Sequence, residues 1–141
     1  MKDHKLIEPC YRGDGKLSLF CAMRHLYPGK GFAVEYADDK GVYGNGNRET
    51  GAEHLLWEDE GEAPIQSEVE AQIATVTPII ELAWLRHLRT IKLAESDWTQ
   101  SPDIPETLKT KWATYRQALR DLPANTKPAD YRNPTWPTEP S

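Results

Sequence analysis

The chain has 141 residues, 38% of them hydrophobic, and a formal net charge of -5 at pH 7. This length suits one domain with a modest core, and 11 prolines with 9 glycines favour many turns and extended connections. The acidic excess lies mainly before Gln66 and no basic run is interleaved with aromatic residues, which argues against nucleic-acid binding. No apolar segment is long enough for a signal peptide or a membrane span, so we expect a cytoplasmic protein without membrane contact.

The first part of the chain predicts a small antiparallel sheet with one helix packed on it. Residues 16–27 carry apolar side chains at helical spacing and are followed by Pro28 and Gly29, a common helix stop. Residues 31–36, 42–43 and 54–57 are β-prone segments. Turn residues at 38–41 and at Asn45 and Gly46 separate these segments, as expected for short hairpins.

Cysteine and histidine residues give no sign of catalysis or metal binding. Cys10 and Cys21 can pair in principle, but one possible pair without a secretion signal favours two reduced thiols. Cys21 and His25 lie four residues apart on the predicted helix, yet nothing in the sequence orients the imidazole. We therefore interpret them as a buried cysteine beside a half-exposed histidine. The sequence predicts no metal site, no cofactor and no catalytic residue.

A long helix follows the acidic loop at residues 58–62. Ser67 and Glu70 fit a capping box, in which each side chain bonds a free backbone amide of the first turn. The helix should carry one apolar stripe, since its apolar residues are spaced by three or four: Val69, Ile73, Val76, Ile80, Trp84, Leu88 and Ile91. Pro78 lies inside the stripe, so the helix either kinks there or restarts with Thr77 as its cap.

A second amphipathic helix begins near Pro105, with a stripe formed by Leu108, Trp112, Tyr115, Leu119 and Leu122. We expect the basic residues to occupy its other faces: Lys109, Lys111, Arg116 and Arg120. The two helices predict a helical hairpin over residues 67–123, joined by a turn at 97–102. Repeated prolines leave residues 124–141 as an extended tail. The predicted fold class is α+β, with a small antiparallel β unit and one short helix at residues 1–66.

Three runs in the C-terminal half occur in a fixed order. They are KLAESDWTQSPDIP at 92–105, KWATYRQALRDLP at 111–123 and NPTWPT at 133–138. Together they resemble the phage tail assembly chaperone family, and the acidic run at 58–70 is similar to the linker before the family's first long helix. The resemblance implies a virus-encoded, non-enzymatic protein of the host cytoplasm that binds a tail, tail-fibre or baseplate subunit. A structural protein retained in the virion is the alternative, and a homo-oligomer also stays open.

Four aromatic residues are the candidates for partner binding: Trp98, Trp112, Tyr115 and Trp136. Aromatic residues at helical spacing more often form the core of their own hairpin, which is the competing interpretation for the first three. Trp136 is different, because an aromatic residue in a proline-rich terminus is seldom core by itself. It either folds back on its own hairpin or docks onto another chain.

Overall fold

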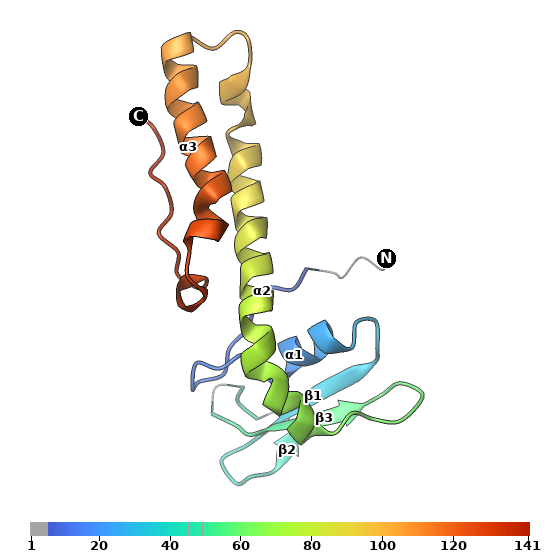
Figure 1. The fold of residues 1–141 in the computed structure, drawn as a ribbon. Coiled ribbons are helices and arrows are strands. Elements are labelled where there is room, and N and C mark those ends of the chain that lie inside the picture. The colour runs from blue at the N-terminus through green and yellow to red at the C-terminus, as the bar shows by residue number, and fades with distance from the viewer. Residues whose placement is uncertain (1–5, 45, 49) are drawn as a thin grey trace. The chain divides into compact units, whose positions relative to one another are not determined.

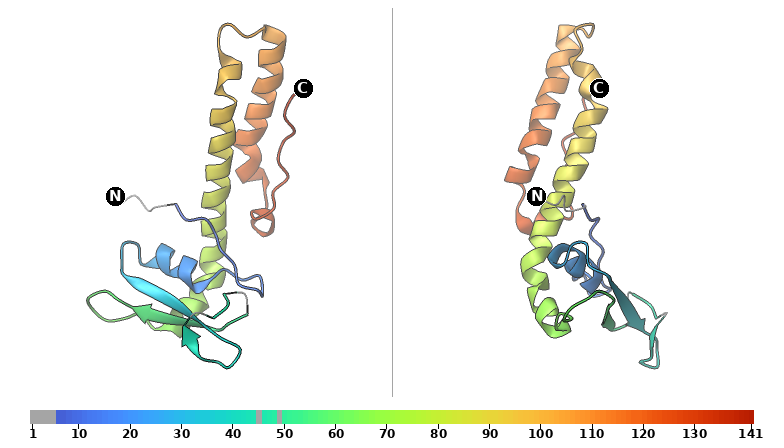
Figure 2. Two further views of the ribbon diagram at one scale, coloured as in Figure 1. Left: turned by 180° about the vertical axis from the view of Figure 1, so that it is seen from behind. Right: turned by 90° about the vertical axis from the view of Figure 1, so that its right-hand side faces the viewer.

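The computed structural model describes residues 6–44, 46–48 and 50–141. Its main elements in chain order are α1 (Leu19–Leu26), β1 (Phe32–Ala37), β2 (Tyr43–Gly44), β3 (Glu53–Trp57), α2 (Gln66–Glu95) and α3 (Glu106–Asn125) (Figure 1). Two short 3-10 helices, η1 (Asp97–Gln100) and η2 (Pro128–Asp130), flank α3. Figure 2 shows the same elements from two further sides. The predicted α+β class is confirmed.

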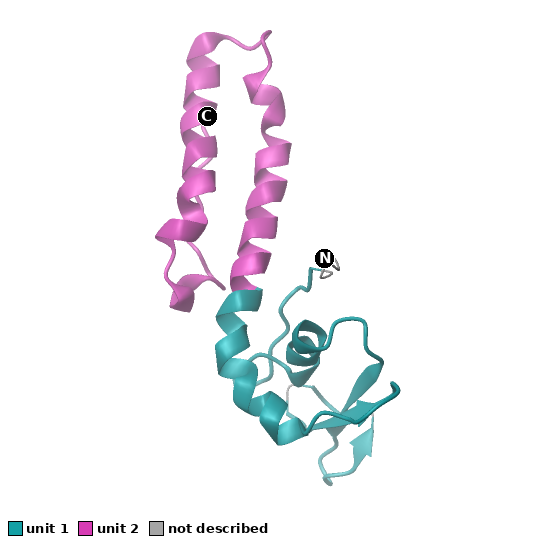
Figure 3. Ribbon diagram, turned by 45° about the vertical axis from the view of Figure 1, so that its right-hand side comes forward, with its two compact units in different colours: residues 1–80 teal, residues 81–141 magenta. Residues whose placement is uncertain are grey.

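The chain divides into two compact units, each with its own packing (Figure 3). Unit 1 comprises Met1–Ile80 and contains the sheet, α1 and the first part of α2. Unit 2 comprises Glu81–Ser141 and contains the rest of α2, α3 and the C-terminal tail. The boundary therefore falls inside a helix that contributes side chains to both units.

The sheet of unit 1 has three antiparallel strands in the order β2-β1-β3. In the β1–β3 pair Phe32 lies opposite Trp57, and at the other edge Ala37 of β1 lies opposite Tyr43 of β2. The predicted antiparallel sheet is confirmed, although β2 is very short. Asn45, which belongs to the second predicted turn, lies outside the described residues.

Two side chains fix the first turn of α1. Ser18 caps the helix, because its Oγ accepts the amide of Cys21 at 3.3 Å. Glu53 reaches over from β3, and its Oε2 accepts the amide of Leu19 at 2.9 Å. A carboxylate at a helix N-terminus satisfies a free amide and complements the positive end of the helix dipole. The helix ends at Leu26, as the Pro28 stop predicted.

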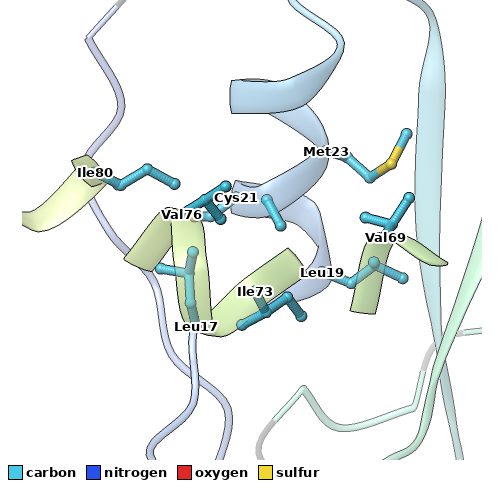
Figure 4. Close-up of a cluster of buried hydrophobic side chains, with 9 residues drawn as sticks. Leu17, Leu19, Cys21, Met23, Val69, Ile73, Val76 and Ile80 are labelled. Atoms are coloured by element: carbon cyan, nitrogen blue, oxygen red, sulfur yellow. The ribbon is translucent and has the colours of Figure 1, made fainter. Parts of the chain in front are cut away.

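The core of unit 1 lies between α1 and the first part of α2 (Figure 4). Buried side chains come from both helices and from the residues just before α1: Leu17, Leu19, Cys21, Ala22, Met23, Val69, Ile73, Val76 and Ile80. The four residues from α2 confirm the predicted stripe in this half of the helix. The sheet adds alternate residues of β1 and β3, which point to one face: Phe32, Val34, Leu55 and Trp57. Each large aliphatic side chain buried here contributes roughly 1.5–3 kcal/mol.

The predicted capping box at the start of α2 is wrong. The helix begins at Gln66, so Ser67 lies within it. The Gln66 side chain instead binds β3: Nε2 donates to the Glu53 carbonyl and Oε1 accepts the Leu55 amide, both at 2.8 Å. These two groups face away from β1, since the neighbouring residues of β3 make the bonds to β1. The side-chain amide therefore occupies the edge of β3 as a further strand would.

The helix α2 continues through Pro78 without a break. The predicted restart at Thr77 therefore does not occur, and Thr77 is an interior residue. Its Oγ1 donates to the carbonyl of Ile73 at 2.6 Å, a bond typical of threonine within a helix. The packing of the helix on both sides of Pro78 supplies the stabilisation that the missing amide removes.

Unit 2 is a helical hairpin with a small core, formed by Leu85, Tyr115, Leu119 and Leu122. The stripe predicted for α3 is confirmed at its last three positions. The stripe predicted for α2 is half-buried at Trp84 and Leu88 but fails at Ile91, which is 41% exposed, whereas Leu85, outside the predicted stripe, is buried. Here α2 packs on α3 rather than on α1, and the new partner covers other positions. The helix α3 runs through Pro123 to Asn125, so it ends later than predicted.

Candidate protein-binding surface

Arg116 of α3 anchors the turn that joins the two helices of unit 2. Its Nη1 donates to the Leu93 carbonyl at 2.6 Å and to Ser96 Oγ at 2.7 Å, and its Nη2 donates to Asp97 Oδ1 at 2.7 Å. The side chain is 10% exposed, against 66% for that of Asp97. The prediction that Arg116 lies on an outer face is therefore wrong. Its guanidinium is buried because every bond that it makes is strong and well directed.

Further polar side chains of the turn form hydrogen bonds within unit 2. Ser96 Oγ donates to two carbonyl groups of the last turn of α2, both at 3.0 Å. The Thr99 hydroxyl donates to the Ser96 carbonyl at 2.6 Å, and both residues are buried. Gln100 Nε2 donates to the Lys109 carbonyl of α3 at 3.3 Å. Side-chain hydrogen bonds therefore hold this short segment in one conformation.

Trp98 lies in the same turn but points outward. Its side chain is 56% exposed, although its ring packs on Trp112 with centroids 5.9 Å apart. The Trp112 ring in turn meets Tyr115 edge-on at 5.5 Å, and Tyr115 is buried. The structure thus joins three of the four candidate residues into an aromatic ladder, which we define as Trp98, Trp112 and Tyr115. The ladder leads from the core of unit 2 to its surface.

Tyr115 at the inner end of the ladder is uncharged at neutral pH. Burial raises the pKa of its hydroxyl, and the negative charges of Glu139 and Glu95 raise it further. Glu139 belongs to the C-terminal tail, which runs beside α3 (Figure 1). The competing interpretation, that these aromatic residues form the hairpin core, holds for Tyr115 but not for Trp98.

Trp136 folds back on its own hairpin. The short helix η2 reverses the chain after α3, and the tail then runs beside the hairpin (Figure 2). Lys92 of α2 places its Nζ 5.1 Å from the centroid of the Trp136 ring, which is a cation–π contact. Trp136 is half-buried there. The structure therefore supports the first of the two alternatives for this residue within the single chain.

The sequence contained a pattern that indicates the buried position of Arg116. Arg116 follows Trp112 by four residues and precedes Leu119 by three, so it occupies a position of the apolar stripe. Its charge alone suggested an exposed side chain. A charged residue at a stripe position next to a serine-rich and aspartate-rich turn is better interpreted as a buried anchor with polar partners.

The described residues contain no group of three or more His, Cys, Asp or Glu side chains that could hold a metal ion. None of the helices in that part of the chain is long and apolar enough to cross a membrane. Residues 82–141, nearly all of unit 2, match the family model described as phage tail assembly chaperone protein. Comparisons with curated proteins and with solved structures found no match. The resemblance inferred from the three sequence runs is confirmed for this region, and it supports a role in phage tail assembly.

Proposed function

We propose that this chain, whose residues 82–141 match the model of the phage tail assembly chaperone family, helps to build a phage tail by binding a tail protein. The client is a tail, tail-fibre or baseplate subunit, which the chain binds in the host cytoplasm without catalysing a reaction. The observation that carries this proposal is the exposed ring of Trp98 on a turn held by hydrogen bonds. Such a surface offers a partner one large apolar contact in a fixed position.

The rigidity of the turn favours binding through Trp98. Ordering a mobile loop would cost free energy on association, and the bonds of Arg116 and Ser96 have already ordered this one. Tryptophan is also enriched among the residues that dominate interface energies. Covering roughly 100 Å² of the exposed ring would contribute about 2.5 kcal/mol, which is roughly 70-fold in Kd. A single anchor of this size suits a client that must later be released.

The four candidate residues have different parts in this proposal. Trp98 makes the main contact, and the half-buried Trp112 extends it along α3. Tyr115 supports Trp112 from below and is itself covered. Trp136 acts from the tail, where Lys92 holds its ring against α2. Substitution of Trp136 should therefore affect binding less directly than substitution of Trp98.

The direct test measures the affinity of the purified chain for the tail, tail-fibre and baseplate proteins encoded by the same phage. Trp98→Ala should weaken binding to one of them by at least about tenfold, while the melting temperature changes little because the ring is mostly exposed. Tyr43→Ala is the matched control, since it removes a 45% exposed aromatic side chain from unit 1. Equal affinities for wild type and Trp98→Ala would contradict the proposal.

Mass spectrometry of salt-washed phage particles separates transient assistance from permanent incorporation. An assembly factor should be absent from the particles and bound to its client in extracts of infected cells. A fixed ratio to a known tail subunit would instead identify a structural component of the virion. The contact through Trp98 is expected in both cases. This measurement therefore shows whether the complex is transient or permanent, and it does not test the binding surface.

A further inference from the structure

Two cysteines of unit 1 lie side by side although no disulfide joins them. Cys10 precedes α1 and Cys21 lies within it, and their sulfur atoms are 2.7 Å apart. A bridge between Tyr11 and Leu17 turns the chain back on itself, so that Cys10 returns to the first turn of α1. The separation is longer than a disulfide bond, which measures about 2.05 Å, and a small movement would close it.

The surroundings of the two sulfur atoms differ, and they indicate which thiol ionises more readily. Cys10 is half-buried, and its Sγ lies 2.9 Å from Ser18 Oγ. The thiol of Cys21 lowers the pKa of Cys10 by hydrogen bonding, with further lowering from Ser18 and from the positive charge of Arg48. The same bond and burial raise the pKa of Cys21. Cys10, the less buried of the two, is thus the thiol that ionises more readily, and Cys21 is the one that retains its proton more strongly.

We propose that Cys10 and Cys21 form a redox-sensitive dithiol that a hydroperoxide oxidises to an intramolecular disulfide. The geometry points to this inference: the two sulfur atoms are adjacent, Cys10 is half-buried, and Cys21 is buried against it. Buried structural cysteines without such a neighbour are inert, whereas an accessible thiolate beside a second thiol is typical of redox-sensitive pairs.

The reaction consumes one hydroperoxide per chain. With hydrogen peroxide, the Cys10 thiolate attacks one oxygen, the O–O bond breaks, hydroxide leaves, and Cys10 becomes a sulfenic acid. The Cys21 sulfur then attacks the Cys10 sulfur, the S–S bond forms and the S–O bond breaks. The proton of Cys21 leaves with the departing hydroxide as water. Two thiols are oxidised by two electrons and the peroxide is reduced to water.

The disulfide would fasten the segment before α1 to the helix. It closes the short loop that contains Ser18, the capping residue of α1, and so restricts the unfolded chain. Reducing conditions such as those of a bacterial cytoplasm would keep the pair open, and an oxidising medium would close it. This property belongs to unit 1 and does not depend on client binding by unit 2.

The test treats the full-length native chain with a small excess of hydrogen peroxide and follows its mass without reductant. The expected product is a monomer that has lost two hydrogen atoms, has no free thiol and returns to the starting mass with dithiothreitol. Its melting temperature should rise by about 5–10 °C relative to the reduced chain. Persistence of both thiols, or a product linked only between chains, would overturn the proposal.

Two variants separate the roles of the thiols. Cys21→Ser should stop at the Cys10 sulfenic acid, which dimedone traps, whereas Cys10→Ser should leave Cys21 unreactive toward peroxide. Equal reactivity of the two variants would contradict the assigned order. The wild-type chain gives a test that does not depend on folding of a variant: at pH 7 it should form the disulfide at least about tenfold faster when native than when unfolded in urea. An equal or faster reaction in urea would also overturn the proposal.

Discussion

Unit 1 and unit 2 reach a stable fold by different means. Unit 1 packs aliphatic side chains of two helices against one face of a sheet, which gives it a closed apolar core. Unit 2 packs two α-helices and a returning tail without a sheet, so its core is small and its turn depends on the buried hydrogen bonds of Arg116. A helical hairpin offers a single face for packing, and polar anchors and aromatic residues complete it. The same arrangement leaves Trp98 available to a partner.

The largest effect is expected from Leu119→Ala in unit 2. Leu119 is fully buried, and truncation should lower the free energy of unfolding by about 3 kcal/mol. Leu19→Ala, which removes an equally buried side chain from unit 1, is the matched comparison. Hydrogen exchange should show that each substitution loosens mainly its own unit. Equal loss of protection in both units after either substitution would show that the two cores are not separate.

Arg116→Met should destabilise unit 2 by about 2 kcal/mol, because it keeps the length of the side chain but removes all its donors. Arg116→Lys should fall between wild type and Arg116→Met, since one ammonium group cannot reproduce the guanidinium fork. Urea unfolding of the three proteins gives the comparison. Wild-type stability of Arg116→Met would mean that the turn does not need its polar anchor.

Trp136→Ala should cost about 1 kcal/mol, because the contact with Lys92 is partly exposed. Lys92→Gln should have a smaller effect, and the double variant should lose less than the sum of the two. This non-additivity, measured by thermal unfolding, is the signature of a direct contact. Strict additivity would show that the ring and the ammonium group do not interact in solution.

The smallest effect concerns the carboxyl group of Glu53 and depends on pH. Burial raises the pKa of Glu53 above its ordinary value of 4.5, although the bond from Leu19 opposes the shift. The folded chain therefore binds this proton more tightly than the unfolded chain, so ionisation above pH 4.5 lowers stability. Glu53→Gln keeps an acceptor for Leu19 and should remove this contribution. A stability profile of Glu53→Gln identical to that of wild type between pH 4.5 and 7 would contradict the assignment.

Hydrophobic periodicity predicted the elements of both units because it reports which face of a helix is covered. It succeeded for Val69 to Ile80, where the covering partner is α1, and failed at Ile91, where the partner is α3. The local sequence pattern of a helix does not determine which other element packs against it. The capping box at the start of α2 was predicted wrongly for a related reason. The first residue of the helix, Gln66, bonds the backbone of β3, which is distant in the sequence, and not the amides of its own helix.

The sequence named the candidate residues of this surface but could not give the exposure of each. The sequence singled out Trp98, Trp112 and Tyr115, and their order from surface to core emerged only from the contact between the turn and α3. Spacing along the chain likewise could not bring Cys10 to Cys21, because the bridge that reverses the chain between them has no strong sequence signal. The order of the aromatic residues and the pairing of the cysteines both depend on tertiary contacts between segments that are separate in the sequence.

Hydroxyl-radical labelling of the tryptophans, free and in complex with the tail protein, measures whether a partner covers Trp98. Trp98 is 56% exposed, whereas Trp57 of unit 1 is half-buried and serves as the internal reference. Trp98 should be the most strongly oxidised tryptophan of the free chain and should become protected in the complex, while labelling of Trp57 is unchanged. Undiminished labelling of Trp98 in the complex, or protection confined to Trp57, would contradict binding through Trp98.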